Sequence, residues 1–189
     1  MKKTNLEKFY KEQIVDILSK ELVISNKMEV PKLSKIVLNM GLGEAKDNKN
    51  SLQQAIEEIS LITGQKPIIR KSKKAISNFK IRENDPVGLS VTLRKKKMYE
   101  FLERFIAIVS PRIRDFRGFS SKGFDGMGNY NFGINEQVVF PEINYDKVNA
   151  IRGMNLTFVT SAKDDSSAFK LLDSFGFPFR KVSKDQNQD

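Results

Sequence analysis

A dense group of basic side chains is the feature of this sequence best suited to binding a charged partner. Eleven Lys and Arg residues stand between 66 and 97, and only Glu83 and Asp85 oppose them. Phosphate groups attract such clusters, and the release of counterions makes the binding sensitive to salt. We expect Lys71, Lys73 and Lys74 to lie in a connection between two strands, from which they reach outward. A solvated loop that only aids solubility is the alternative explanation.

A second candidate is the polar side of a strand expected at residues 87–94. Apolar and polar residues alternate there, which is typical of a half-buried strand. The polar set, joined by Asn39 from a neighbouring strand, consists of Gly88, Ser90, Thr92 and Arg94. Small hydrogen-bonding residues on an open sheet face suit an RNA minor groove, which presents 2′-hydroxyls, base edges and phosphates. A sheet face that only meets water remains the alternative.

A third candidate is the segment 111–119, in which three arginines alternate with Ile and Phe. Arginine holds phosphates or carboxylates with two parallel hydrogen bonds, and the aromatic rings could stack or simply pack. The alternative is an intramolecular ion pair, such as Arg114 with Asp115 or Glu142.

Several other kinds of chemistry are excluded or disfavoured. The chain has no Cys and no His, so thiolate sites, the usual zinc ligands and His-based catalysis are absent. Gly41-Leu42-Gly43 lacks the later glycine of a dinucleotide loop. Asp164-Asp165 could hold a metal ion, but a helix N-terminus explains the pair better. Any enzyme would depend on Asp, Glu, Lys or Tyr, and no spacing of paired carboxylates supports one.

Size and charge agree with a binding protein. The 189 residues carry 33 Lys and Arg against 23 Asp and Glu, a net charge of +10 with a pI near 9.7. A polyanion is therefore the leading partner. No stretch approaches the roughly 20 apolar residues of a membrane span, and no signal peptide is evident, so we expect a cytoplasmic protein without a membrane partner. In that compartment Asn155-Leu156-Thr157 is an ordinary strand segment and not a glycosylation site.

Hydrophobic periodicity places the elements that must position these residues. Helices are expected at 5–22, 51–63, 95–109 and 165–175, with Asp164 capping the last. Strands are expected at 35–42, 67–71, 87–94, 137–140 and 154–161. Residues 114–135, rich in Gly and Asn, are expected to be irregular, to bury little and to be mobile when unbound. We predict one α+β domain at 1–180, with an antiparallel sheet, helices on one face and an open polar face. A polar, disordered tail is expected at 181–189.

Eleven short blocks that run in order along the chain resemble one known family. They include Asn39-Met40-Gly41-Leu42-Gly43-Glu44, Ser77-Asn78-Phe79-Lys80-Ile81-Arg82, Pro111-Arg112-Ile113-Arg114-Asp115-Phe116-Arg117-Gly118 and Phe140-Pro141-Glu142-Ile143. On these blocks the chain resembles the universal large-subunit ribosomal protein five, in its bacterial form.

The resemblance implies a structural, non-enzymatic part of the large ribosomal subunit that needs no cofactor. Its implied partners are 5S rRNA, large-subunit rRNA, peptidyl-site tRNA, other proteins associated with 5S rRNA and a protein of the small-subunit head. It implies that the protein helps attach 5S rRNA in the central protuberance and takes part in an intersubunit bridge. A free-standing RNA-binding or RNA-chaperone protein is the alternative function.

The resemblance also assigns residues to these partners. The positions matched to 5S rRNA binding are Asn39, Gln65, Thr92 and Arg94. Those matched to the tRNA-side loop are Lys71, Lys73, Lys74, Lys80 and Arg82. Those matched to the bridge side are Arg112, Arg114 and Arg117. One departure from the family is Met127, which stands where the family usually has Arg.

Overall fold

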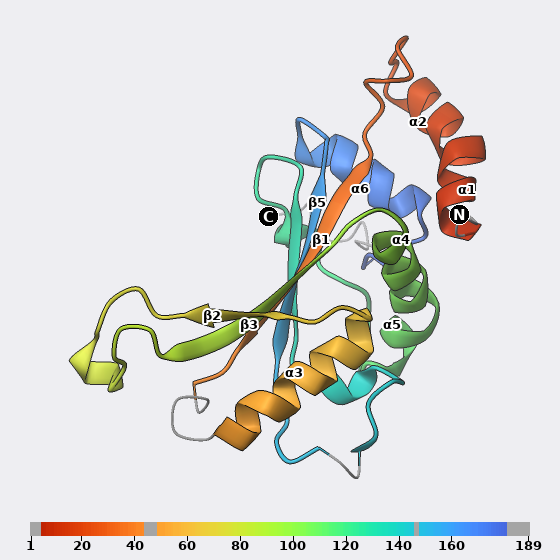
Figure 1. Cartoon of the computed structure of the whole chain (residues 1–189). Coiled ribbons are helices and arrows are strands. Elements are labelled where there is room, and N and C mark those ends of the chain that lie inside the picture. Colours follow the sequence, from red (N-terminus) through yellow and green to blue (C-terminus); the bar gives the residue numbers. More distant parts are fainter. Residues whose placement is uncertain (1–4, 44–48, 146–147, 181–189) are drawn as a thin grey trace, which may run out of the picture.

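The computed structural model describes residues 5–43, 49–145 and 148–180 (Figure 1). The tail expected at 181–189 lies outside the described residues. In the described part, no helix is long and apolar enough to span a membrane. The helices and strands are α1 (Asn5–Phe9), α2 (Val15–Glu21), β1 (Leu33–Gly41), α3 (Lys49–Thr63), β2 (Ile68–Lys71), β3 (Pro86–Leu93), α4 (Lys95–Arg104), α5 (Ser110–Arg112), β4 (Tyr130–Ile134), β5 (Met154–Thr160) and α6 (Asp165–Ser174).

The strands form one antiparallel sheet in the order β2-β3-β1-β5-β4. From residue 35 onward the central strand β1 alternates: Ile36, Leu38 and Met40 are buried, whereas Val37 and Asn39 lie on the other side. Because successive side chains of a strand point to opposite faces, only one face of β1 enters the core. The α4 and α1–α2 helices lie on the same side of the sheet (Figure 1). The predicted α+β architecture, with helices covering one face, is confirmed.

The expected helices are confirmed, with local changes of pitch. A π-helical turn at Tyr10–Ile14 joins α1 to α2, and another at Phe105–Val109 joins α4 to α5. Asp164 caps α6 as predicted, because its carboxylate accepts a hydrogen bond from the backbone N–H of Ser167 at 3.1 Å. Side chains that point inward from these helices share a core with the sheet, in which the Phe105 ring lies 5.4 Å from that of Phe132.

Two of the expected elements are wrong. Residues 137–140 are not a strand, because Gln137–Val139 forms a 3-10 turn. The apolar run at 137–140 is too short for its periodicity to distinguish a strand from other structure. In the structure the side chain of the buried Gln137 donates a hydrogen bond to the carbonyl of Ala150, which lies in a loop. Residues 130–134, expected to be irregular, form β4, which pairs with β5. Gly133 and the neighbouring asparagines lower strand propensity, but pairing and the inward-facing Tyr130 and Ile134 override it.

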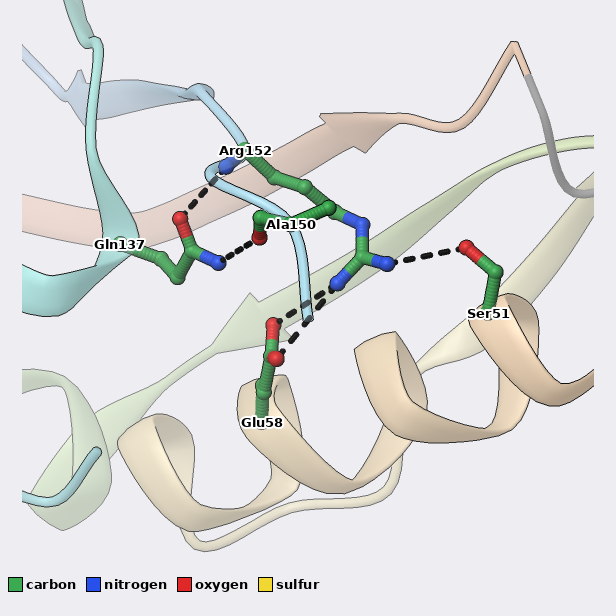
Figure 2. A network of polar contacts seen from close by, with 5 residues as sticks. All are labelled: Ser51, Glu58, Gln137, Ala150 and Arg152. Carbon is green, nitrogen blue, oxygen red and sulfur yellow. Dashed lines mark hydrogen bonds and ion pairs between the residues drawn. The ribbon is translucent and has the colours of Figure 1, made fainter. Parts of the chain in front are cut away.

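A buried ion pair fastens the loop before β5 to helix α3 (Figure 2). The guanidinium of Arg152 lies 3.4 Å from the Glu58 carboxylate and donates to the Ser51 hydroxyl at 2.9 Å. Gln137 completes the network: its amide donates to the carbonyl of Ala150 at 2.7 Å, and its side-chain oxygen accepts from the N–H of Arg152 at 2.5 Å. Burial raises the pKa of Glu58, and the nearby Arg152 charge opposes that rise.

Replacing Arg152 by Met is expected to lower the free energy of unfolding by about 3 kcal/mol at neutral pH, because Glu58 is left buried without a counter-charge. Without Arg152 the pKa of Glu58 rises further, so its ionised form opposes folding once the pH exceeds 4.5, the ordinary value for this group. The loss in stability should therefore be larger at about pH 8 than at about pH 5.

Urea unfolding at the two pH values measures this difference. Arg70→Met, which alters an exposed arginine, serves as the control and should change stability little at either pH. A loss of stability for Arg152→Met that is the same at both pH values would show that Glu58 does not depend on Arg152.

Candidate nucleic-acid interface

The face of the sheet opposite the helices carries two rows of small polar side chains. Register places Asn39 of β1 between Asn155 of β5 and Ser90 of β3. The next row runs from Asn131 through Thr157 and Val37 to Thr92. Most of these side chains are exposed or half-buried, so hydroxyl and amide groups line a surface that the helices leave open. We call this surface the polar sheet face.

The four residues assigned to 5S rRNA lie around β1 and β3. Thr92 sits one row from Asn39, and Gln65 reaches the same place because its amide donates to the carbonyl of Thr92 at 3.4 Å. Arg94 follows β3 directly and is exposed at the start of α4. The fold thus gathers these four residues, which come from three separate segments of the chain, at one side of the polar sheet face.

Ser90 contributes less to this face than the alternation indicates. It is only 3% exposed, although it lies on the same side of β3 as Thr92. Its neighbours across the strands are Asn39 and Ile68, both larger, and a small side chain between them is covered. The hydroxyl of Ser90 is therefore a weaker candidate for direct contact with a ligand.

Three further residues belong to the polar sheet face and were missed from the sequence. Asn131, Asn155 and Thr157 share its rows, and the Thr157 hydroxyl donates to the Asn131 side-chain oxygen at 2.7 Å. The alternation of polar and apolar residues in 154–160 was a usable signal for two of them. Asn131 gave no such signal, because its strand was expected to be irregular.

The basic residues at 71–82 lie on a hairpin that extends past the sheet (Figure 1). Pairing continues beyond the end of β2, because the N–H of Ser72 donates to the Asp85 carbonyl at 2.8 Å. The Asp85 carboxylate is used within the hairpin, where it accepts from the N–H of Arg82 at 2.7 Å. The five cations assigned to this loop, all exposed, are Lys71, Lys73, Lys74, Lys80 and Arg82.

The three arginines of the bridge-side segment project from the end of α5 and the turns after it. Arg112, Arg114 and Arg117 are exposed, and within the described residues none forms a salt bridge. The alternative pairing of Arg114 with Asp115 or Glu142 is wrong, because Arg114 forms no salt bridge in the described part of the chain and the Glu142 carboxylate lies 3.4 Å from Arg104 instead. Guanidinium groups without an internal partner stay available for phosphates or carboxylates of another molecule.

The Gly-rich segment that follows is packed, which corrects the expectation that it buries little. The centroid of the Phe119 ring lies 4.6 Å from that of the Phe132 ring, and the backbone of Phe119 forms a parallel β-bridge with that of Phe179. Gly118, with φ of +95°, makes this approach possible, because a Cβ there would lie 2.7 Å from the Arg180 backbone. The segment is therefore built on the core.

The loop at 125–129 is held by two carboxylates. Asp125 accepts from the side-chain amide of Asn129 at 2.8 Å and from the backbone N–H groups of Met127 at 2.9 Å and Asn129 at 3.1 Å. These bonds, above all the one from the Asn129 amide, lower the pKa of Asp125. Asp165, at the start of α6, accepts from the N–H groups of Gly126 at 3.0 Å and Gly128 at 2.9 Å. Met127 itself is 74% exposed at the apex of the loop.

The carboxylates and the buried tyrosines of the described residues have structural surroundings. No group of three or more Asp and Glu residues there could hold a metal ion. Asp164 and Asp165 are used by a helix cap and by the loop at 125–129. Burial raises the pKa of Tyr10, Tyr99 and Tyr130 to about 12, so these hydroxyls stay protonated at neutral pH.

Comparison with known proteins covers almost the whole chain. A family model described as ribosomal protein L5 matches residues 26–82, and a second, described as the C-terminus of the same ribosomal protein family, matches residues 86–179. A protein of Dichelobacter nodosus named large ribosomal subunit protein uL5 is 54% identical over 175 residues, 93% of this chain and 98% of that one. Proteins of the same name are 55% identical in Xanthomonas campestris pv. campestris strain 8004 (94% of this chain, 98% of that one) and 54% identical in Clostridium tetani (92% and 97%).

Proposed function

The chain belongs to the family of the large ribosomal subunit protein uL5, and from that premise we propose that it binds 5S rRNA through the polar sheet face. Proteins of this family are structural, non-enzymatic components of the ribosome. The observation that carries the proposal is the open face itself, on which rows of Asn and Thr side chains lie without a covering helix.

The chemistry of that face suits double-helical RNA. The RNA minor groove is wide and shallow, and it presents 2′-hydroxyls that both donate and accept hydrogen bonds. Asn and Gln amides and Thr hydroxyls can also do both, so they match this surface better than charged groups would. Arg94 at the edge adds a charge for a phosphate, and the net charge of +10 favours the encounter. Binding 5S rRNA in this way would help attach it in the central protuberance, beside large-subunit rRNA and the other proteins associated with 5S rRNA.

We propose further that the hairpin and the bridge-side segment meet other partners. The hairpin at 71–85 extends past the sheet, so its lysines can contact peptidyl-site tRNA while the face holds 5S rRNA (Figure 1). The exposed arginines at 112, 114 and 117 lie on a separate part of the surface, and we assign them to contact with a protein of the small-subunit head. A free-standing RNA-binding or RNA-chaperone protein would use the same face, but it would not sediment with large subunits.

Replacing Asn39 and Thr92 by Ala together is expected to weaken 5S rRNA binding by about 2 kcal/mol, because RNA hydroxyls or phosphates at the interface lose their partners. The dissociation constant of the purified protein for 5S rRNA measures the effect. Asn149→Ala, which alters an exposed amide outside the sheet, is the control. If the folded double variant binds 5S rRNA as tightly as the native protein, the polar sheet face is not part of the interface with 5S rRNA.

Replacing Lys71, Lys73 and Lys74 by Ala is expected to leave 5S rRNA affinity nearly intact at moderate salt. The same change should speed the dissociation of tRNA from the peptidyl site of assembled ribosomes, because charge attraction to its phosphates is lost. Filter binding of labelled tRNA over time measures this rate. The opposite pattern, lost 5S rRNA binding with an unchanged tRNA rate, would place the hairpin on 5S rRNA.

Met127→Arg tests the bridge-side assignment. Because Met127 is exposed, the variant should keep its stability and its affinity for 5S rRNA. If an acidic surface of the small-subunit head faces this loop, subunit association should tighten by less than about 1 kcal/mol, the scale of an exposed charge pair. Titration of subunit association with magnesium measures this change. Weaker association of the Arg variant would contradict an acidic partner at this loop.

A further inference from the structure

The tip of the basic hairpin exposes two large apolar side chains. Phe79 is 68% exposed and Ile76 is 46% exposed, on a segment whose other side chains are mostly charged or polar. We propose that Phe79 is a stacking platform for an exposed base of the bound tRNA, a role that rests on the proposed contact between the hairpin and tRNA. The lysines supply attraction to the phosphates, and the ring supplies contact with a base.

The tip is held in shape before any ligand arrives. Ile76 and Ile81 exchange two backbone hydrogen bonds, at 2.9 and 3.1 Å, which close the turn. Between them Ser77–Phe79 forms a 3-10 turn, and Lys80 follows in the left-handed region with its N–H bonded to the Ser77 carbonyl at 2.9 Å. A ring carried on a fixed turn loses little conformational entropy on binding, so more of the stacking energy appears as affinity.

The surroundings of the ring favour a nucleic acid base over other apolar partners. Residues 71–82 carry five cations and no carboxylate, so the ring is presented within positive charge. A partner that suits both features has a flat apolar face beside a negative group, and an unpaired base with its phosphate has both.

Ribosomes that carry substitutions at Phe79 test the proposal through the rate of tRNA dissociation from the peptidyl site. Phe79→Ala should raise this rate about tenfold, within the range measured when a stacked aromatic is removed. Phe79→Leu should behave almost like Ala, because it keeps apolar surface without a ring, whereas Phe79→Tyr should stay close to the native rate. A Leu variant as slow as the native protein, or a Tyr variant as fast as Ala, would overturn stacking.

The lysine variant separates this inference from the proposed function. If the Lys71, Lys73 and Lys74 substitutions speed dissociation and those at Phe79 do not, the stacking is wrong and the tRNA contact stands. If neither set changes the rate, the hairpin does not contact tRNA and both fail. Incorporation of 5S rRNA should be native in every variant, because Phe79 lies outside the polar sheet face.

Fluorescence of the purified protein gives a direct reading of stacking. The chain has no Trp, so Phe79→Trp introduces one Trp at the hairpin tip, and excitation beyond the absorption band of the four Tyr residues selects its emission. Addition of tRNA should quench it, whereas a long RNA duplex or anionic lipid vesicles should quench it far less, because nearly all bases of the duplex are stacked inside the helix and the vesicles have none. Met127→Trp, exposed on a different loop, is the control and should respond little to tRNA. Quenching at position 79 by vesicles or duplex but not by tRNA would reject base stacking.

Discussion

The burial of one side of strand β1 is the constraint on which the rest of the molecule depends. Ile36, Leu38 and Met40 are almost completely buried, and the alternation of a strand then forces Val37 and Asn39 to the opposite face. A shift of one residue would exchange the two sets, so the apolar core fixes the register strongly. The polar sheet face therefore has its geometry set by the core behind it, and its rows are as rigid as the strands.

Aromatic packing extends this rigidity to the bridge-side segment. The Phe119 and Phe132 rings, 4.6 Å apart, connect an otherwise Gly-rich stretch to the core. Asp165 then holds the loop at 125–129 through two backbone N–H groups, at the start of a helix where a negative charge is favourable. The exposed arginines and Met127 therefore lie on segments that the core and Asp165 hold in place.

The hairpin between β2 and β3 is held by backbone hydrogen bonds and not by packing against the core. It has almost no buried side chains, so backbone hydrogen bonds such as those between Ser72 and Asp85 and between Ile76 and Ile81 define its shape. Such a structure can project away from the core and keep its cations in solvent. The two surfaces therefore differ in kind: the sheet face is fixed by the core behind it, whereas the hairpin is a charged extension with an exposed aromatic ring near its tip.

The helices and the strands β3, β1 and β5 could be predicted from the sequence, because each has a strong periodic pattern of apolar residues, and the fold class follows from them. The sequence also placed Asn39 and Thr92 on the polar side of their strands, since alternation fixes the face of each residue. It could not give β4, because Gly133 and its asparagine neighbours have low strand propensity and only pairing with β5 orders them. It also could not show that Ser90 is covered by its neighbours, or that Asn131 joins Thr157 across two strands. Those facts depend on which strands become neighbours, a long-range outcome of packing that no local pattern contains.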